Sequence, residues 1–321
     1  MIDITIQNFE TELIGASMQQ PVLLDIWAPW CGPCKSLGPV LEKLETAYEG
    51  RFLLAKLNSD EQPEIAGQLS QAFGVRSIPF CVLFSQGQPV DGFVGALPEA
   101  EIRKFLEKHV PSVDALEADA EVAEAEQLLA EGGDIDAALA KLQEAVAIDP
   151  SNDGARIDYL KLLLSEAAAD PARIAQARQA FEPVASKVLS DTRYAAIEHW
   201  LKACEAMATA RPMAELDAAI SANRRDFNAR FERAQWLFAQ GETTAAMDEL
   251  LEILMRDKGW NQEMARKTYV AILELMTKPA KADPAAGSAK GTLELTGKAA
   301  AAPAADPVLD QYRRKLSMAL F

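Results

Sequence analysis

Two cysteines separated by two residues, Cys31 and Cys34, are the side chains of this sequence best suited to chemistry. Disulfide exchange needs a thiolate that attacks, a second thiol that resolves the mixed disulfide, and access for the partner. An amphipathic helix is expected to begin after Cys31, where unpaired backbone N–H groups favour the thiolate. Gly32 and Pro33 set the turn, because proline is tolerated at a helix start. The spacing therefore indicates thiol–disulfide exchange, with Cys31 as nucleophile and Cys34 as resolving thiol.

A CxxC pair can instead hold zinc, so the other potential metal ligands decide between the two chemistries. A structural zinc site takes four Cys or His ligands. The sequence has no second CxxC pair, and its two histidines, His109 and His199, each stand alone. We therefore expect no metal and no organic cofactor, only a redox-active disulfide between Cys31 and Cys34.

The first 110 residues must supply the elements that position this pair. Short apolar runs at 22–27, 52–57 and 81–84 predict strands, and the turn residues 86–89 follow the last of them. Apolar residues recur at helical spacing over 37–48 and 97–110. Strands that alternate with helices predict an α/β unit over residues 1–110, with a hairpin near its end.

The character of the sequence changes after a short linker predicted at 111–114. Two segments beginning at Leu128 and Leu237 resemble each other, since each has a Gly turn followed by Ala-Ala and a later Leu. They lie about three units of the ~34-residue tetratricopeptide period apart. We therefore predict an all-α array of helical repeats over 115–277, with the run DPSN at 149–152 as a stop between units and the number of repeats left open.

Residues 278–305 contain eleven Ala, three Pro and three Gly among 28 positions, which predicts a flexible linker. An amphipathic helix is expected over 306–321. Its apolar stripe either docks on the last repeat or enters a groove on a partner protein. The stripe consists of Leu309, Tyr312, Leu316 and Leu320, and Phe321 ends the chain.

The formal net charge of −16 excludes some classes of partner. Nucleic acids and anionic membranes both need a positive protein surface, so we expect neither. No apolar run approaches the roughly 20 residues of a membrane-spanning helix. The ten acidic residues over 114–144 are expected to form solvated helix faces.

Cysteine usage indicates the compartment. Four cysteines in 321 residues do not make the disulfide framework of a secreted domain, and residues 1–6 lack the features of a signal peptide. We therefore expect a cytoplasmic protein. Cys81 is expected to be a buried strand residue, with a regulatory third thiol as the alternative, and Cys204 is expected in the core of a repeat helix.

The run WAPWCGPCK at 27–35 resembles the active-site stretch of the thioredoxin family. Asp25 matches that family's buried carboxylate, and Lys56 matches its neighbouring lysine. The resemblance implies the thioredoxin fold, a mixed sheet flanked by helices. It also implies that Cys31 attacks, that Asp25 takes the proton of Cys34, and that Trp30 lies at the partner-facing turn.

Two later segments carry the same resemblance. Ile78 and Pro79 match the family's cis-proline segment, and Gly95 matches the small-residue loop that touches partners. In the family, the proline packs on the sulfur pair and keeps metals out. Phe80 and Cys81 depart from the pattern, because small or aliphatic residues are usual there.

A thioredoxin unit followed by tetratricopeptide-like repeats resembles the bacterial chaperedoxin family. The runs at 84–93, 266–269 and 312–316 are similar to it as well, so the resemblance covers the chain except the 278–305 insert. It implies a stress-response holdase that protects unfolding or oxidised clients through mixed disulfides and passes them to the GroEL and DnaK foldases. Thioredoxin reductase or glutathione would recycle the disulfide. The tail would contact GroEL through Tyr312, Leu316, Leu320 and Phe321.

Two functions therefore remain open. The first is a chaperedoxin that combines holdase activity with thiol–disulfide exchange on many bacterial cytoplasmic clients. The second is a thioredoxin-like disulfide reductase whose helical repeats select one dedicated protein partner.

Overall fold

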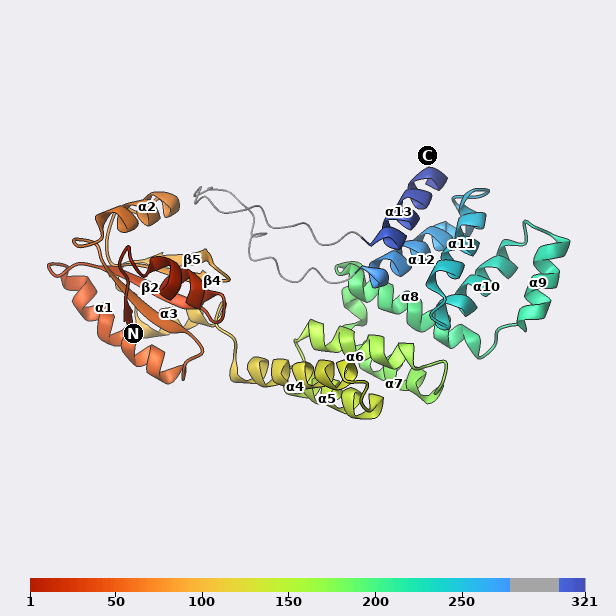
Figure 1. Cartoon of the computed structure of the whole chain (residues 1–321), viewed down its shortest axis with the longest axis horizontal. Coiled ribbons are helices and arrows are strands. Elements are labelled where there is room, and N and C mark those ends of the chain that lie inside the picture. Colours follow the sequence, from red (N-terminus) through yellow and green to blue (C-terminus); the bar gives the residue numbers. More distant parts are fainter. Residues whose placement is uncertain (278–305, 321) are drawn as a thin grey trace. The chain divides into compact units, whose positions relative to one another are not determined.

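The computed structural model describes residues 1–277 and 306–320, which form two compact units (Figure 1). The first unit covers Met1–Val113, and the second begins at Asp114. The linker predicted at 278–305 and the terminal Phe321 lie outside the described residues. No helix of the described part is both long enough and apolar enough to cross a membrane.

A five-stranded mixed sheet organises the first unit, in the spatial order β1-β3-β2-β4-β5. The strands β1, β3 and β2 run parallel, whereas β4 is antiparallel to β2 and forms a hairpin with β5. The three predicted strands and the hairpin are confirmed, with ends displaced by at most one residue. The strands are β1 (Ile2–Asp3), β2 (Val22–Trp27), β3 (Leu53–Asn58), β4 (Phe80–Ser85) and β5 (Gln88–Val94).

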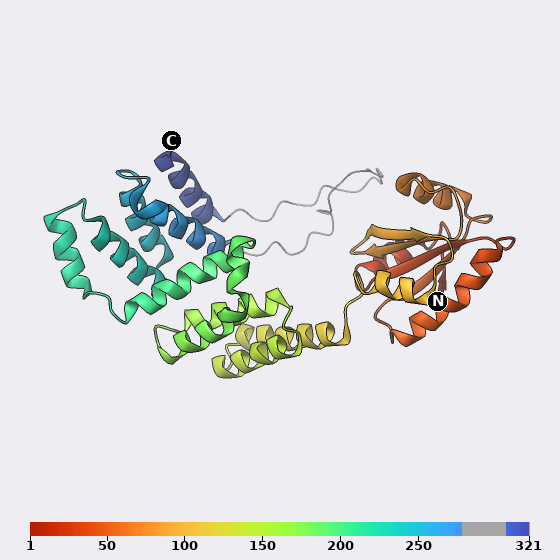
Figure 2. The ribbon, with the colours of Figure 1, turned by 180° about the vertical axis from the view of Figure 1, so that it is seen from behind.

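Helices cover both faces of this sheet (Figures 1 and 2). Helices α1 (Gly32–Ala47) and α3 (Glu99–Leu106) share a hydrophobic core with one face, which includes Leu23 of β2. The segment η1 (Phe9–Gly15) and helix α2 (Pro63–Phe73) pack on the other face, which includes Leu24. Successive side chains of a strand alternate between faces, so Asp25 lies on the same face as Leu23, toward α1.

Helices alone make up the described part of the second unit, which confirms the predicted α-helical repeat fold. One hydrophobic core runs through it from Ala125 to Tyr312. Gly132 and Gly241 have φ values of 68° and 79°, and each ends the first helix of a pair, as the repeated turn predicts. The helices are α4 (Val113–Ala130), α5 (Ile135–Ile148), α6 (Asp153–Ser165), α7 (Ala172–Phe181), η2 (Glu182–Leu189), α8 (Thr192–Met207), α9 (Met213–Ala222), α10 (Phe227–Ala239), α11 (Thr243–Leu254), α12 (Trp260–Met276) and α13 (Pro307–Leu320).

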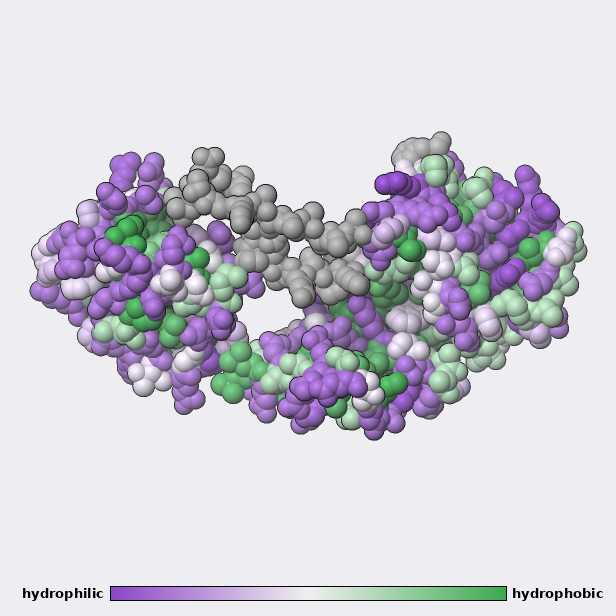
Figure 3. Space-filling model, in the orientation of Figure 1, coloured by the Kyte–Doolittle hydropathy of each residue, from purple (hydrophilic) through white to green (hydrophobic). Residues whose placement is uncertain are grey.

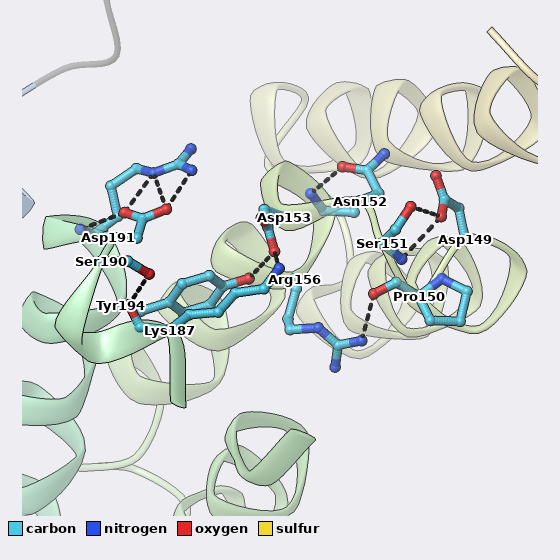
Figure 4. A network of polar contacts seen from close by, with 12 residues as sticks. Asp149, Pro150, Ser151, Asn152, Asp153, Arg156, Lys187, Ser190, Asp191 and Tyr194 are labelled. Atoms are coloured by element: carbon cyan, nitrogen blue, oxygen red, sulfur yellow. Dashed lines mark hydrogen bonds and ion pairs between the residues drawn. The ribbon is translucent and has the colours of Figure 1, made fainter. Parts of the chain in front are cut away.

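The junction predicted at 149–152 ends one helix and starts the next (Figure 4). The Asp149 carboxylate accepts hydrogen bonds from the backbone N–H and hydroxyl of Ser151 at 2.9 and 2.6 Å. Asn152 then caps α6 by accepting from the N–H of Ala155 at 3.0 Å. The next residue, Asp153, accepts a 2.6 Å hydrogen bond from the hydroxyl of Tyr194, which ties α6 to α8.

The terminal helix α13 docks on α11 and α12 of its own unit. Leu309 and Tyr312 are buried there, each with 6% of its surface exposed. The Tyr269 hydroxyl donates to the backbone carbonyl of Tyr312 at 2.8 Å, and the Tyr312 hydroxyl donates to Asp248 at 3.1 Å. Lys315 forms an ion pair with the same Asp248 at 2.9 Å. Of the two interpretations of this helix, the structure therefore shows the docked one.

Candidate active site

The disulfide between Cys31 and Cys34 lies at the start of α1. Cys31 is the N-cap residue, and its Sγ accepts a hydrogen bond from the backbone N–H of Cys34 at 3.2 Å. Such a donor, together with the helix dipole, favours negative charge on Cys31 once the disulfide is reduced. Each cysteine has 4% of its surface exposed, whereas Trp30 beside them is 71% exposed. Trp30 is thus the exposed side chain beside two largely buried sulfurs.

A second segment packs on the disulfide. The Ile78–Pro79 peptide bond is cis, and Ile78 lies in the same apolar cluster as Cys31 and Cys34. The backbone N–H of Gly95 donates to the carbonyl oxygen of Pro79 at 2.8 Å. The structure thus joins the two segments that sequence analysis assigned to partner contact.

Asp25 is the buried carboxyl group of this unit, with 2% of its surface exposed. In the centre of the sheet it is the register partner of Lys56 on β3 and of Cys81 on β4. Burial raises the pKa of Asp25 to about 6, against smaller lowering effects from the Lys56 charge and a Cys81 hydrogen bond. A carboxyl group with this pKa can accept and release a proton near neutral pH.

Lys56 is held by a second acidic residue. Its Nζ lies 2.6 Å from Oε1 of Glu42, which projects from α1. Lys56 is therefore beside Asp25 in register, as predicted, but its direct ion-pair partner is Glu42. Because Glu42 shares its charge, Lys56 only partly offsets the cost of burying the Asp25 carboxylate.

Comparison with known proteins matches each unit to a family. The thioredoxin family profile matches residues 1–108, and a tetratricopeptide repeat profile matches residues 206–296. Thioredoxin of Chlorobaculum thiosulfatiphilum is 48% identical over 106 residues, which cover 93% of that protein and 33% of this chain. Thioredoxin 1 of Nostoc sp. is 42% identical over 107 residues, with coverage of 94% and 33%. Thioredoxin of Haemophilus influenzae is 41% identical over 103 residues, with coverage of 91% and 32%.

The chain belongs to the thioredoxin family. Its thioredoxin domain supports thiol–disulfide exchange with protein substrates through a redox-active disulfide rather than a cofactor. The repeat region that follows this domain in the sequence supports protein interaction. Within residues 1–277 and 306–320, no three His, Cys, Asp or Glu side chains are grouped so that they could hold a metal ion.

Three side chains around the thioredoxin disulfide site were not anticipated from the sequence. Glu42 neutralises Lys56, and Asp60 accepts a 3.0 Å hydrogen bond from the indole N–H of Trp30. The thiol of Cys81 donates to Asp25, with 3.7 Å between Sγ and Oδ1. Cys81 was assigned to the correct strand, but its neighbour across the sheet depends on the register between β2 and β4. Asp60 and Glu42 carry no motif that marks them.

The remaining site predictions concern the repeat unit. Tyr312, Leu316 and Leu320 lie in α13, where Leu316 packs against the core and the Leu320 carbonyl accepts a 2.7 Å hydrogen bond from Lys258. Phe321 lies outside the described residues. Cys204 is buried in α8, and burial raises the pKa of its thiol to about 12. Cys204 is thus a core residue of a repeat helix, as expected.

The repeat unit also contains an apolar groove of about 630 Å³. It is lined by parts of α4, α5, α6, α8, α10, α11 and α12, so residues far apart in sequence form one surface, which also includes the charged Glu126, Asp158 and Lys161. Leu129 reaches it with 40% of its surface exposed. Apolar side chains that line this repeat groove include Leu129, Leu142, Leu162, Trp200, Leu275 and Met276.

Proposed function

We propose that this protein is a chaperedoxin, which holds unfolding client proteins and exchanges disulfides with their cysteines. The observation that carries the proposal is the presence, on one chain, of a thioredoxin disulfide site and a repeat unit with an apolar groove. The first can form mixed disulfides with exposed cysteines. The second offers the kind of surface that exposed apolar segments bind.

The disulfide at the start of α1 and the buried Asp25 support the redox half of the proposal. In the reduced protein, the Cys31 thiolate attacks a client disulfide and forms a Cys31–client mixed disulfide, releasing the client's other sulfur as a thiolate. Asp25 accepts the proton of Cys34, whose sulfur attacks Cys31 and displaces the client thiolate. The Cys31–Cys34 disulfide is then reduced by thioredoxin reductase or glutathione, which we place with this protein in the bacterial cytoplasm.

The holding half depends on the apolar groove and on the charge of the chain. Hydrophilic residues cover most of the visible surface of both units, and hydrophobic residues show in smaller areas (Figure 3). The net charge of −16 keeps such a protein soluble while it carries an aggregation-prone client. A groove lined by Leu, Met and aromatic side chains can bind apolar segments of many sequences.

Transfer of clients to GroEL or DnaK requires a contact with the foldase, and we propose α13 for it. Its docked face buries Tyr312, whereas Met318 on the same helix is 74% exposed. Capture through Met318 can occur with α13 docked, and capture through Tyr312 requires α13 to detach. Purified GroEL should be retained by the full chain and lost after deletion of 306–321. Undiminished capture by the deletion would contradict this assignment.

Suppression of thermal aggregation of an unrelated, thermolabile protein tests the holdase activity directly. The full chain should reduce light scattering at near-stoichiometric ratios, with or without mild oxidant. A complete failure to suppress aggregation under both conditions would contradict the chaperedoxin proposal. It would favour the second candidate, a disulfide reductase whose repeats select one partner, which the limited volume of the groove also suits.

Trapping with the Cys34→Ser variant identifies the clients. Without the resolving thiol, mixed disulfides at Cys31 persist and can be isolated from oxidatively stressed cells. A chaperedoxin should trap many unrelated cytoplasmic proteins, whereas a dedicated reductase should trap one. The Cys31→Ser/Cys34→Ser double variant is the matched control, because it retains the fold but cannot form the bond.

A further inference from the structure

We propose that Cys81 is a positioning residue of the disulfide site, whose buried thiol holds the Asp25 carboxylate in its proton-accepting form. The inference rests on the thiol–disulfide exchange proposed above and assigns a role to a residue that is not part of the CxxC pair. Cys81 touches neither the partner nor the reacting sulfurs in this role. It acts through Asp25.

The sheet fixes the two residues side by side. Asp25 in β2 and Cys81 in β4 are register partners, with 3.7 Å between Cys81 Sγ and Asp25 Oδ1. Their exposed fractions are 0% for Cys81 and 2% for Asp25. Because β2 and β4 are adjacent strands of the sheet, their register holds the two residues opposite each other. The contact is therefore built into the fold.

The same environment keeps Cys81 protonated. Burial, followed by the adjacent negative charge of Asp25 and the hydrogen bond to it, raises the pKa of the Cys81 thiol well above its usual value. A thiol that retains its proton is a hydrogen-bond donor and a poor nucleophile. In this proposal Cys81 acts as a hydrogen-bond donor and not as the regulatory third thiol that the sequence left open.

Two groups on neighbouring strands lower the pKa of Asp25, Lys56 more than Cys81. Lys56 on β3 favours the carboxylate, but Glu42 on α1 holds Lys56 at 2.6 Å. Cys34 on α1 is tied up in the disulfide with Cys31 in this structure. Cys81 on β4 makes direct hydrogen-bond contact with the carboxylate. It therefore adds to the effect of Lys56 and opposes the burial that favours protonated Asp25.

The consequence appears in the resolving step. The Cys34 thiol passes its proton to Asp25, its sulfur electron pair forms the bond to Cys31 Sγ, and the client sulfur leaves as a thiolate. This step needs Asp25 as the anion at the outset. A donor at Cys81 extends the anionic form to lower pH, so that the resolving step stays fast in mildly acidic or stressed cells.

The test compares Cys81→Val, which fills the space without a donor, with the unmodified full chain. The rate of resolution is measured from pH 5 to pH 9 as release of a chromophoric aromatic thiol from a mixed disulfide at Cys31. We expect Cys81→Val to move the acidic midpoint upward by about one pH unit and to leave the rate at pH 9 within about twofold. An unchanged midpoint in a folded variant would overturn the inference.

An infrared measurement separates donation from packing. In the oxidised protein, Cys81 and Cys204 supply the thiols, and loss of a band in Cys81→Val assigns the S–H stretch of Cys81. That band should move to lower frequency as Asp25 ionises and should lose its pH dependence in Asp25→Asn. A pH-independent Cys81 band would overturn the inference. Neither the pH profile nor the infrared band depends on client binding. Full exchange activity of Cys31→Ser would contradict the proposed function itself, independently of the role of Cys81.

Discussion

The two units treat buried polar groups in opposite ways. In the thioredoxin domain, Asp25 is buried beside a weak thiol donor and its pKa is raised, so that its charge is poorly compensated. In the repeat unit, Arg230 is almost fully buried but lies 2.7 Å from Glu249 and also donates to the backbone carbonyl of Arg224. The first arrangement leaves a group able to take a proton, whereas the second leaves a stable cross-link between helices.

The contrast extends to how each unit meets a partner. The thioredoxin domain concentrates its chemistry in two sulfur atoms at the start of one helix. The repeat unit spreads its apolar groove over several helices, and no single side chain dominates it. Damage to one atom should therefore abolish the first function. Loss of binding at the groove should require substitutions that replace its apolar side chains by charged ones.

The Cys31→Ser variant should separate the redox activity from aggregation suppression most clearly. Insulin reduction should fall at least about a thousand-fold, because the attacking thiolate is removed. Suppression of thermal aggregation without oxidant should remain within about twofold of the unmodified protein, since the repeat groove is unchanged. Equal insulin reduction by both proteins would contradict the site assignment, and a parallel loss of both activities would contradict the separation of roles.

The converse experiment places charge in the groove. The double variant Leu129→Glu/Met276→Glu should suppress aggregation several-fold less, while insulin reduction stays unchanged. An apolar segment that binds in the groove would bury the added charges, which costs free energy. Leu189→Glu/Val270→Glu is the matched control, since Leu189 and Val270 are 97% and 46% exposed and do not line the groove. Equal loss in the control would show that added negative charge, rather than the groove, is responsible.

Sequence reasoning succeeded where the signal was local. The helix start at Cys31, the apolar strands, and the glycine turns at Gly132 and Gly241 each depend on neighbours within a few residues, and the structure has all of them. Helix α2 carries the same kind of local signal in Ile65 and Leu69, four residues apart, although the predicted elements did not include it.

Other features could not be read from one sequence. The contact between Cys81 and Asp25 requires the register of two strands 56 residues apart. The sequence also could not show where α13 docks, because one apolar stripe suits docking within its own chain as well as docking on a partner. Helix α4 begins at Val113, within the linker predicted at 111–114.

The free-energy cost of burying the poorly compensated Asp25 carboxylate gives a third way to test the contrast between the units. Because the pKa of Asp25 is about 6 in the folded protein and 3.8 in its ordinary state, the folded state binds more protons between these values. The stability of the thioredoxin domain should therefore fall as pH rises through this window, by up to roughly 3 kcal/mol. Asp25→Asn should remove the loss and be more stable at pH 8 but not at pH 3.5. Hydrogen exchange of β2 and β4 amides measures this, and an equal effect at both values would refute it.

A fourth test concerns the polar contact that docks α13. Tyr269→Phe removes a second donor from the Tyr312 carbonyl, which lies inside α13 and keeps its helical acceptor role, at a cost of about 0.5–1.5 kcal/mol. Hydrogen exchange over 307–320 should accelerate by up to about tenfold, while the thioredoxin domain is unaffected. Thr209→Val is a suitable control, since its hydroxyl bonds within its own turn at 3.4 Å and makes no contact with α13. Unchanged exchange in Tyr269→Phe would mean that this hydrogen bond does not hold α13, and that docking depends on the apolar stripe and on the contacts of Asp248 instead.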